Sequence, residues 1–213
     1  IRKLANTILK EPVEVNIAIS RPPDKMKQGA FIVYDEQKIP LVKHILKERE
    51  YNSVLIFCSS KQSVKQLTKD LKKQKLPADE IHSDLEQEQR EQVLINFKSK
   101  QLKILVATDI LSRGIDIEDI ELVINYDVPH EGEDYIHRIG RTARAASTGT
   151  AYTFINDKEQ FKFHRIEELL GRPVEKLQVP AELGPVPETQ TEFRKPSGNR
   201  NKKRYNKFKQ KPS

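Results

Sequence analysis

The chain has 213 residues, among them 38 Lys or Arg, 31 Asp or Glu and a single cysteine, Cys58. One cysteine excludes an intramolecular disulfide and a cysteine-based zinc site and favours a reducing, cytoplasmic compartment, and no apolar run reaches the roughly 18 residues of a membrane-spanning helix. The net charge of +7 lies wholly in residues 188–213, which hold nine Lys or Arg and two Glu, so the neutral remainder must bind any polyanion with individually placed residues.

The first 20 residues predict the end of a preceding domain. Residues 1–10 have apolar side chains at helical spacing, and residues 13–17 alternate like a strand. The proline-containing stretch that follows predicts an interdomain linker at 21–27. Because the chain begins with isoleucine and its one methionine is Met26, we expect it to be part of a longer protein.

Between residues 28 and 180, strand and helix patterns alternate. Strands are predicted at 30–34, 53–58, 80–82, 103–107, 122–125 and 150–155, and helices at 37–49, 62–75, 87–98 and 158–169, with the segment 135–144 before the last strand. The continuous apolar run SVLIFC at 53–58 is typical of a parallel strand that is buried on both faces. The pattern predicts an α/β domain with a doubly wound parallel sheet and helices on both faces.

Residues 181–213 predict a disordered basic tail, because they contain too few apolar side chains to form a core. Basic residues alternate there with Phe193, Tyr205 and Phe208, a pattern that suits RNA binding through charge and stacking. The alternative is a tail that only keeps the protein in solution.

Polar residues follow two of the predicted central strands. Ser59 and Ser60 come after the strand at 53–58, and Thr108 and Asp109 come after the strand at 103–107. Ligands of doubly wound sheets bind at the carboxyl ends of the strands, where hydroxyl groups and helix N-termini can donate to phosphates. The alternative is that Ser60 and Asp109 only cap the helices that follow.

Residues 107–116 combine hydroxyl, carboxylate and guanidinium groups with a glycine. Gly114 permits close backbone approach or a positive φ, and Asp116 could accept hydrogen bonds from a ribose. The alternative is a turn in which Arg113 pairs with an aspartate.

The basic stretch HRIGRTAR occupies residues 137–144. If it forms a helix, His137, Arg141 and Arg144 share one face. Two guanidinium groups on one face suit phosphate oxygens. A solvated basic helix face is the alternative.

Five segments in this order resemble the second RecA-like domain of a DEAD-box ATP-dependent RNA helicase, closest to the bacterial RhlE-like branch. They are LIFCSS at 55–60, QxxR at 87–90, ATDILSRGID at 107–116, VINYD at 123–127 and HRIGRTAR at 137–144. Residues 1–11 also resemble the segment near the end of the family's first domain. Ser83, Ser112 and Ala143 stand where the family more often has Gly, Ala and Gly.

The resemblance implies roles in ATP hydrolysis. Arg141 and Arg144 would act as arginine fingers on ATP held by the first domain, with His137 coupling the cleft to that domain. Asp116 would contact the ribose and Arg113 would hold the closed state by ion pairing. The positions that the resemblance assigns to the nucleotide are Asp116, Arg113, Gly114, Arg141 and Arg144.

The resemblance also implies RNA as a partner, bound independently of sequence through its sugar–phosphate backbone. The residues that would contact RNA are Ser59, Arg90, Thr108 and Gly114. Single-stranded or duplex RNA and the first RecA-like domain are the expected partners, with ribosomal or ribonucleoprotein components as further ones.

The sequence contains no phosphate-binding loop of the form GxxxxGK[ST] and no Asp-Glu-Ala-Asp motif. We therefore expect ATP and Mg²⁺ to be held by the first domain and the chain alone to be inactive. A non-catalytic RNA-binding module is the main alternative, and a DNA-acting relative is a further one.

Overall fold

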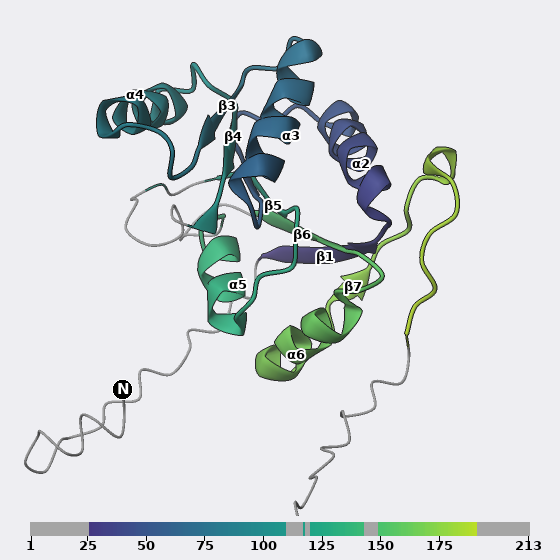
Figure 1. Ribbon diagram of the computed structural model, residues 1–213. Coiled ribbons are helices and arrows are strands. Elements are labelled where there is room, and N and C mark those ends of the chain that lie inside the picture. Colours follow the sequence, from purple (N-terminus) through teal and green to yellow (C-terminus); the bar gives the residue numbers. More distant parts are fainter. Residues whose placement is uncertain (1–25, 110–116, 118–119, 143–148, 191–213) are drawn as a thin grey trace, which may run out of the picture.

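The computed structural model describes residues 26–109, 117, 120–142 and 149–190. Within them, one sheet of seven strands has the order β3-β4-β2-β5-β6-β1-β7, and every pair is parallel (Figure 1). The strands are β1 (Lys27–Ile32), β2 (Val54–Phe57), β3 (Ala78–Ile81), β4 (Ile104–Ala107), β5 (Leu122–Asn125), β6 (Thr150–Ile155) and β7 (Glu175–Lys176). The predicted parallel α/β sheet is confirmed.

Helices cover both faces of this sheet. They are α2 (Asp35–Glu48), α3 (Lys61–Lys73), α4 (Gln87–Lys98), α5 (Gly132–Ile139) and α6 (Gln160–Leu170). Helices α2 and α3 pack into one hydrophobic cluster, and α4, α5 and α6 pack into the other, on the opposite face. The fold is the α/β architecture with helices on both faces of a parallel sheet that the sequence predicts.

The central strands form where the sequence is continuously apolar. All four residues of β2, β4 and β5 are buried, as expected for parallel strands with helices on both sides. Helix α3 instead is amphipathic, with Val64, Leu67 and Leu71 buried. It begins at Ser60, whose hydroxyl accepts a hydrogen bond from the Ser63 backbone N–H at 3.1 Å, so the predicted cap is confirmed.

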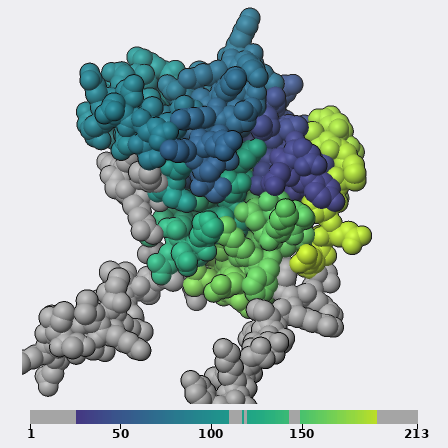
Figure 2. Space-filling view, in the orientation of Figure 1, coloured from purple at the N-terminus to yellow at the C-terminus, as the bar shows by residue number. Residues whose placement is uncertain are grey.

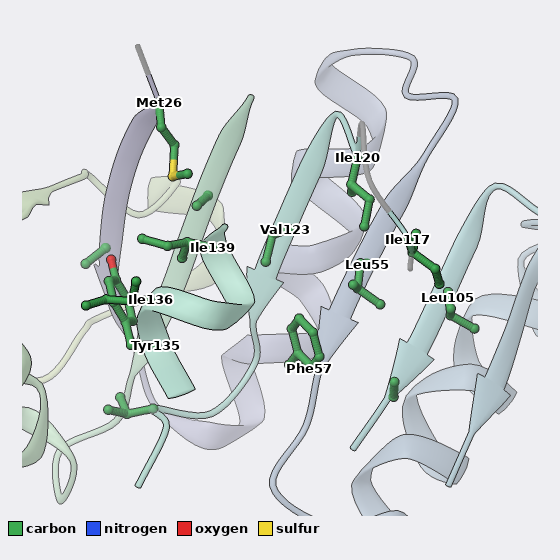
Figure 3. Packing of buried hydrophobic residues seen from close by; sticks show 14 of the residues in the cluster. Met26, Leu55, Phe57, Leu105, Ile117, Ile120, Val123, Tyr135, Ile136 and Ile139 are labelled. Atoms are coloured by element: carbon green, nitrogen blue, oxygen red, sulfur yellow. The ribbon is translucent and has the colours of Figure 1, made fainter. Parts of the chain in front are cut away.

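Helix α5 packs against one face of the sheet. Tyr135, Ile136 and Ile139 are buried in the same hydrophobic cluster as Val123 and Phe57 (Figure 3). The helix follows the carboxyl end of β5 and runs back along the sheet, so that the turn after Ile139 lies near Ile120, which precedes β5.

The domain is larger at both ends than the sequence predicts. The first strand begins at Lys27, not at residue 30, and Met26 is buried in the core, so both lie within the domain although they were assigned to the linker at 21–27. The two-residue strand β7 was not predicted. Residues 1–25, with the predicted helix, strand and most of the linker, lie outside the described residues.

The predicted start of disorder at residue 181 is wrong for residues 181–190. This segment begins with the 3-10 turn η2 (Ala181–Leu183) and lies beside α2 at the edge of the molecule (Figure 2). Gln37 Nε2 donates to the carbonyls of Leu183 and Pro185 at 2.7 and 3.0 Å. Hydrogen bonds from a side chain to the backbone thus hold this segment in place although it contains few apolar side chains. Residues 191–213 lie outside the described residues.

Candidate nucleic-acid and nucleotide interface

The strands β3, β4, β2 and β5 are neighbours, so the polar residues that follow them meet at one edge. Thr108 follows β4, and its backbone N–H donates to the Ile81 carbonyl of β3 at 3.3 Å. Ser59 lies close after β2 and is exposed. The structure thus places the predicted residues Ser59 and Thr108 at the carboxyl edge, as expected.

Asp127, which follows β5, binds the residues around it at this edge. One of its carboxylate oxygens accepts hydrogen bonds from the backbone N–H and the hydroxyl of Ser59, both at 2.8 Å. Its other oxygen lies 2.9 Å from Nζ of Lys38, a residue of α2 that is 1% exposed. With its proton donated to Asp127, the Ser59 hydroxyl oxygen can still accept a hydrogen bond from a ribose hydroxyl.

Asp127 and Lys38 each stabilise the ionised form of the other. Burial alone would raise the pKa of Asp127, but the Lys38 charge and the hydrogen bonds from Ser59 outweigh it and lower this pKa. Burial would likewise lower the pKa of Lys38, yet the charge of Asp127 and a hydrogen bond to Asp35 raise it. The buried pair is therefore fully charged at neutral pH.

The side chain of Arg138, a residue of α5, connects the carboxyl ends of β4 and β5. It is 1% exposed, and its Nε donates to Asp109 Oδ1 at 2.7 Å, with Nη2 at 2.5 Å from the same oxygen. Its Nη1 donates at 3.2 Å to Oδ1 of Asn125 and to the backbone carbonyl of Asp127. The guanidinium also lies over the Phe57 ring, 5.1 Å from its centroid. These contacts compensate the cost of burying its charge.

Arg138 belongs to the HRIGRTAR stretch, yet sequence reasoning did not single it out. The interpretation of Asp109 as a helix cap was also incomplete, because its carboxylate binds Arg138. The signal that could have identified the pair was an arginine on the apolar side of a predicted helix, where a charge needs a buried partner.

Two predicted RNA contacts carry buried polar atoms that lack a hydrogen-bond partner among the described residues. These atoms are the Thr108 hydroxyl oxygen and Arg90 Nε. Arg90 is anchored from α4 by another atom, Nη2, which donates to the Ser83 carbonyl at 3.1 Å. Unsatisfied buried polar atoms are uncommon and call for a specific explanation, and a ligand with polar groups at this edge provides one.

The loop between β3 and α4 has an ordinary backbone although Ser83 replaces the family's usual glycine. In the described part of the chain, the non-glycine residues with positive φ are Lys75 and Lys100. His82 is buried, and its Nδ1 accepts from the Asp84 backbone N–H at 3.2 Å. The loop therefore contains no positive φ that would require a glycine.

The turn that carries Arg141 follows the C-terminal end of α5 and contacts Ile120, which precedes β5. The helix ends at Ile139, and the N–H groups of Arg141 and Thr142 donate to carbonyls three residues earlier, which is the tighter 3-10 pattern. The predicted helical face shared by His137 and Arg141 is therefore wrong, because α5 does not continue to Arg141.

The reason is a competing set of contacts with the segment before β5. The Ile120 N–H donates to the Arg141 carbonyl at 3.3 Å, and the buried Thr142 hydroxyl donates to the Ile120 carbonyl. Gly149 packs so closely against Thr142 that a Cβ there would overlap the Thr142 carbonyl. These contacts fix the backbone of Arg141.

The remaining predicted residues divide into exposed and undescribed ones. His137 is exposed on α5. Arg144, Arg113, Gly114 and Asp116 lie outside the described residues. The Arg141 turn contacts the segment before β5, whereas Ser59 and Thr108 follow the carboxyl ends of β2 and β4.

Cys58 is fully buried next to this edge, as the sequence predicts. Burial raises the pKa of its thiol well above the usual value, and the charge of Asp127 raises it further. The thiol is therefore a poor nucleophile and serves as a small apolar side chain.

The described part of the chain has no cluster of metal-binding side chains and no membrane-spanning helix. No three His, Cys, Asp or Glu side chains converge there as a metal site would require. None of its helices has the length and apolar character needed to cross a membrane.

The comparisons with known proteins agree with this architecture. A family model described as the helicase conserved C-terminal domain matches residues 37–146. ATP-dependent RNA helicase DbpA of Bacillus subtilis is 39% identical over 183 residues, covering 85% of this chain and 38% of that protein.

Solved structures give the same result. A DEAD box protein from the hyperthermophile Methanococcus jannaschii is 40% identical with a TM-score of 0.68, over 72% of this chain and 42% of that one. S. cerevisiae Dbp5 bound to RNA and ADP BeF3 is 27% identical with a TM-score of 0.72, over 83% of this chain and 48% of that one. The chain therefore spans less than half the length of these three proteins. The RhlE-like assignment stays a prediction.

Proposed function

Because the chain belongs to the family of helicase conserved C-terminal domains, with DEAD-box RNA helicases among its relatives, we propose that it forms the second RecA-like half of an ATP-dependent RNA helicase. In this role it supplies arginine fingers for ATP hydrolysis and part of the surface that binds the RNA backbone. The first RecA-like domain of the same protein supplies the phosphate loop and the groups that hold Mg²⁺.

The observation that carries this proposal is that the C-terminal part of α5 contacts both predicted sites. Arg138, in the last turn of α5, binds Asp109, the neighbour of the RNA candidate Thr108. The turn that directly follows α5 holds the backbone of Arg141 through hydrogen bonds with Ile120. One packed element that contacts both sites supports a coupling between RNA binding and ATP hydrolysis.

The residues at the two sites suit the two ligands. The guanidinium of Arg141 is always charged and has a planar fork of donors that matches phosphate oxygens, and it would stabilise charge on the transferred phosphoryl group. Arg144 and Asp116 complete this role in the proposal. At the carboxyl edge, the donors and acceptors of Ser59, Thr108 and Arg90 suit a sugar–phosphate backbone, which is bound without reference to base sequence.

The test is ATP hydrolysis by the full-length protein with and without single-stranded RNA. We expect RNA to stimulate turnover, and Arg141→Ala to reduce the stimulated rate about a thousandfold or more with little change in RNA affinity. Arg165→Ala serves as the matched control, because Arg165 is an exposed arginine of α6 to which the proposal assigns no ligand contact. The chain alone should not hydrolyse ATP.

Two results would contradict the proposal. If RNA still stimulates ATP turnover in the Arg141→Ala variant, Arg141 is not an arginine finger. RNA binding without any stimulated turnover in the full-length protein would favour the non-catalytic RNA-binding module.

A further inference from the structure

The exposed surface of α3 carries a row of lysines that the proposed RNA contacts do not use. Lys61, Lys65 and Lys69, here called the α3 lysine stripe, are spaced four residues apart on one side of the helix. With Gln62 and Gln66 they line a groove of about 420 Å³, and no acidic residue is among these five. The five lining residues thus form a positively charged patch.

This stripe begins next to the carboxyl edge. Lys61 is the first residue of α3 and follows Ser59 and Ser60 directly. Asp84, one residue after Ser83, lies 2.7 Å from Nζ of Lys61 and 2.9 Å from Nζ of Lys65. The stripe therefore continues the surface on which Ser59 and Arg90 lie.

We propose that the α3 lysine stripe binds additional phosphates of an RNA strand that extends beyond the carboxyl edge. The rise of 1.5 Å per residue places successive lysines about 6 Å apart along the helix, a distance comparable with the spacing of phosphates along a nucleic-acid strand. This inference rests on the proposed function, because the strand must first bind at the carboxyl edge.

Charge on the stripe supports a phosphate ligand. Lys61 and Lys65 are about half exposed, so their ammonium groups can reach a ligand without moving the helix. Among the described residues, the acidic side chain that pairs with both is Asp84, whose pKa the two lysines lower to about 2 through hydrogen bonds and charge. Two ammonium groups around one carboxylate retain a positive charge, and Lys69 adds another.

Asp84 has a second role in this proposal, as a competitor of RNA. Its carboxylate occupies the donors of Lys61 and Lys65 that a phosphate would use. Replacing it by a neutral amide should therefore strengthen RNA binding. A solely structural role for the Asp84 pairs would give the opposite result, since their loss would loosen the edge.

The experiment measures binding of the full chain to two single-stranded RNA oligonucleotides, one about three times longer than the other, over a range of salt concentrations. The test variant is Lys65→Ala with Lys69→Ala, which leaves Lys61 and the carboxyl edge intact. The matched control is Lys43→Ala with Lys47→Ala, the same change at the same spacing on α2. Residues 191–213 are present in every variant, so their charge contributes equally.

We expect the test variant to bind the short RNA like the wild type and the long RNA more weakly. For the long RNA, loss of two phosphate contacts should make the slope of log affinity against log salt less steep by about 1.4. The loss of affinity between 50 and 200 mM salt should therefore be about sevenfold smaller for the test variant than for the wild type. Asp84→Asn should bind the long RNA more tightly than the wild type. The α2 control should behave like the wild type.

The outcomes separate this inference from the proposed function. If the wild type binds neither RNA, the proposed function itself fails. If it binds both but the test variant equals the wild type, or the α2 control loses as much, the stripe is not an RNA site. If the stripe variant loses affinity for polyphosphate but not for RNA, the ligand class is wrong. Weaker binding by Asp84→Asn would contradict the competition.

Discussion

The two ends of β5 are attached to the C-terminal part of α5 by different kinds of interaction. At the carboxyl end of β5, the Arg138 side chain forms an ion pair with Asp109 and hydrogen bonds with Asn125 and the Asp127 carbonyl. At the amino end of β5, the Arg141 turn is fixed by neutral hydrogen bonds with Ile120 and by the close packing of Gly149 against Thr142. The carboxyl end is thus a charged end, and the amino end is a neutral end that depends on shape.

The difference matches the roles proposed for the two ends. Charged groups at the carboxyl edge respond to an approaching polyanion, because their interactions change with the local potential. A turn held by neutral contacts keeps its shape when the charge at the edge changes. We infer that α5 and the Arg141 turn respond to binding at the edge as one rigid element.

The largest effect on stability is expected where the charged end is broken. Arg138→Ala removes a buried cation together with the donors that it offers to Asp109, Asn125 and the Asp127 carbonyl, which should cost about 3–5 kcal/mol of unfolding free energy. Urea denaturation measures it. Arg165→Ala on the exposed side of α6 is the control and should change stability by about 0.5 kcal/mol or less. A small effect of Arg138→Ala would mean that the edge does not depend on this charge.

A smaller loss is expected at the neutral end. Thr142→Val keeps the shape of the side chain but removes the hydroxyl that donates to the Ile120 carbonyl, at a cost of about 1–3 kcal/mol. Thr142→Ser retains the hydroxyl and is the matched control for the hydrogen bond. In the full-length protein, Thr142→Val should slow ATP hydrolysis and leave RNA affinity unchanged. A loss of RNA affinity would show that the two ends are not independent.

The smallest effect is a dependence on pH that only the charged end should show. The pKa of Asp127 is lower in the folded protein than the ordinary value of 3.8, so the unfolded chain takes up the proton first as the pH falls. The stability that Asp127 contributes is complete at neutral pH and is lost as the pH drops through 3.8 toward the folded pKa.

Denaturation at several pH values tests this difference between the ends. The stability gap between the wild type and Asp127→Asn should shrink as the pH falls from neutral toward 3. The gap between the wild type and Thr142→Val should stay constant over the same range. A pH-dependent gap for Thr142→Val would contradict the assignment of a neutral end.

Much of the fold could be predicted because its central strands are short and continuously apolar. The runs that became β2, β4 and β5 are buried on both faces, and this pattern has few other solutions in an α/β chain. The edge strand β7 has two exposed residues and leaves no such pattern. The contacts of residues 181–190 use mainly backbone groups, which composition does not reveal.

The candidate site could be predicted only where function depends on single residues near strand ends, as for Ser59 and Thr108. Arg138 could not be identified because its partners lie 29, 13 and 11 positions away and meet it only through the order of the strands. The end of α5 was missed for the same reason. Its last turn is decided by contacts with Ile120, which local helix propensity does not include.

The most direct test of the account is to map the RNA-binding surface on the chain itself. Backbone amide resonances would be followed by NMR as a single-stranded RNA is added. The account predicts the largest shifts at Ser59, Thr108 and the loop at 82–84, with little change at 181–190. Shifts concentrated at 181–190 or along α6, with the carboxyl edge unaffected, would contradict it.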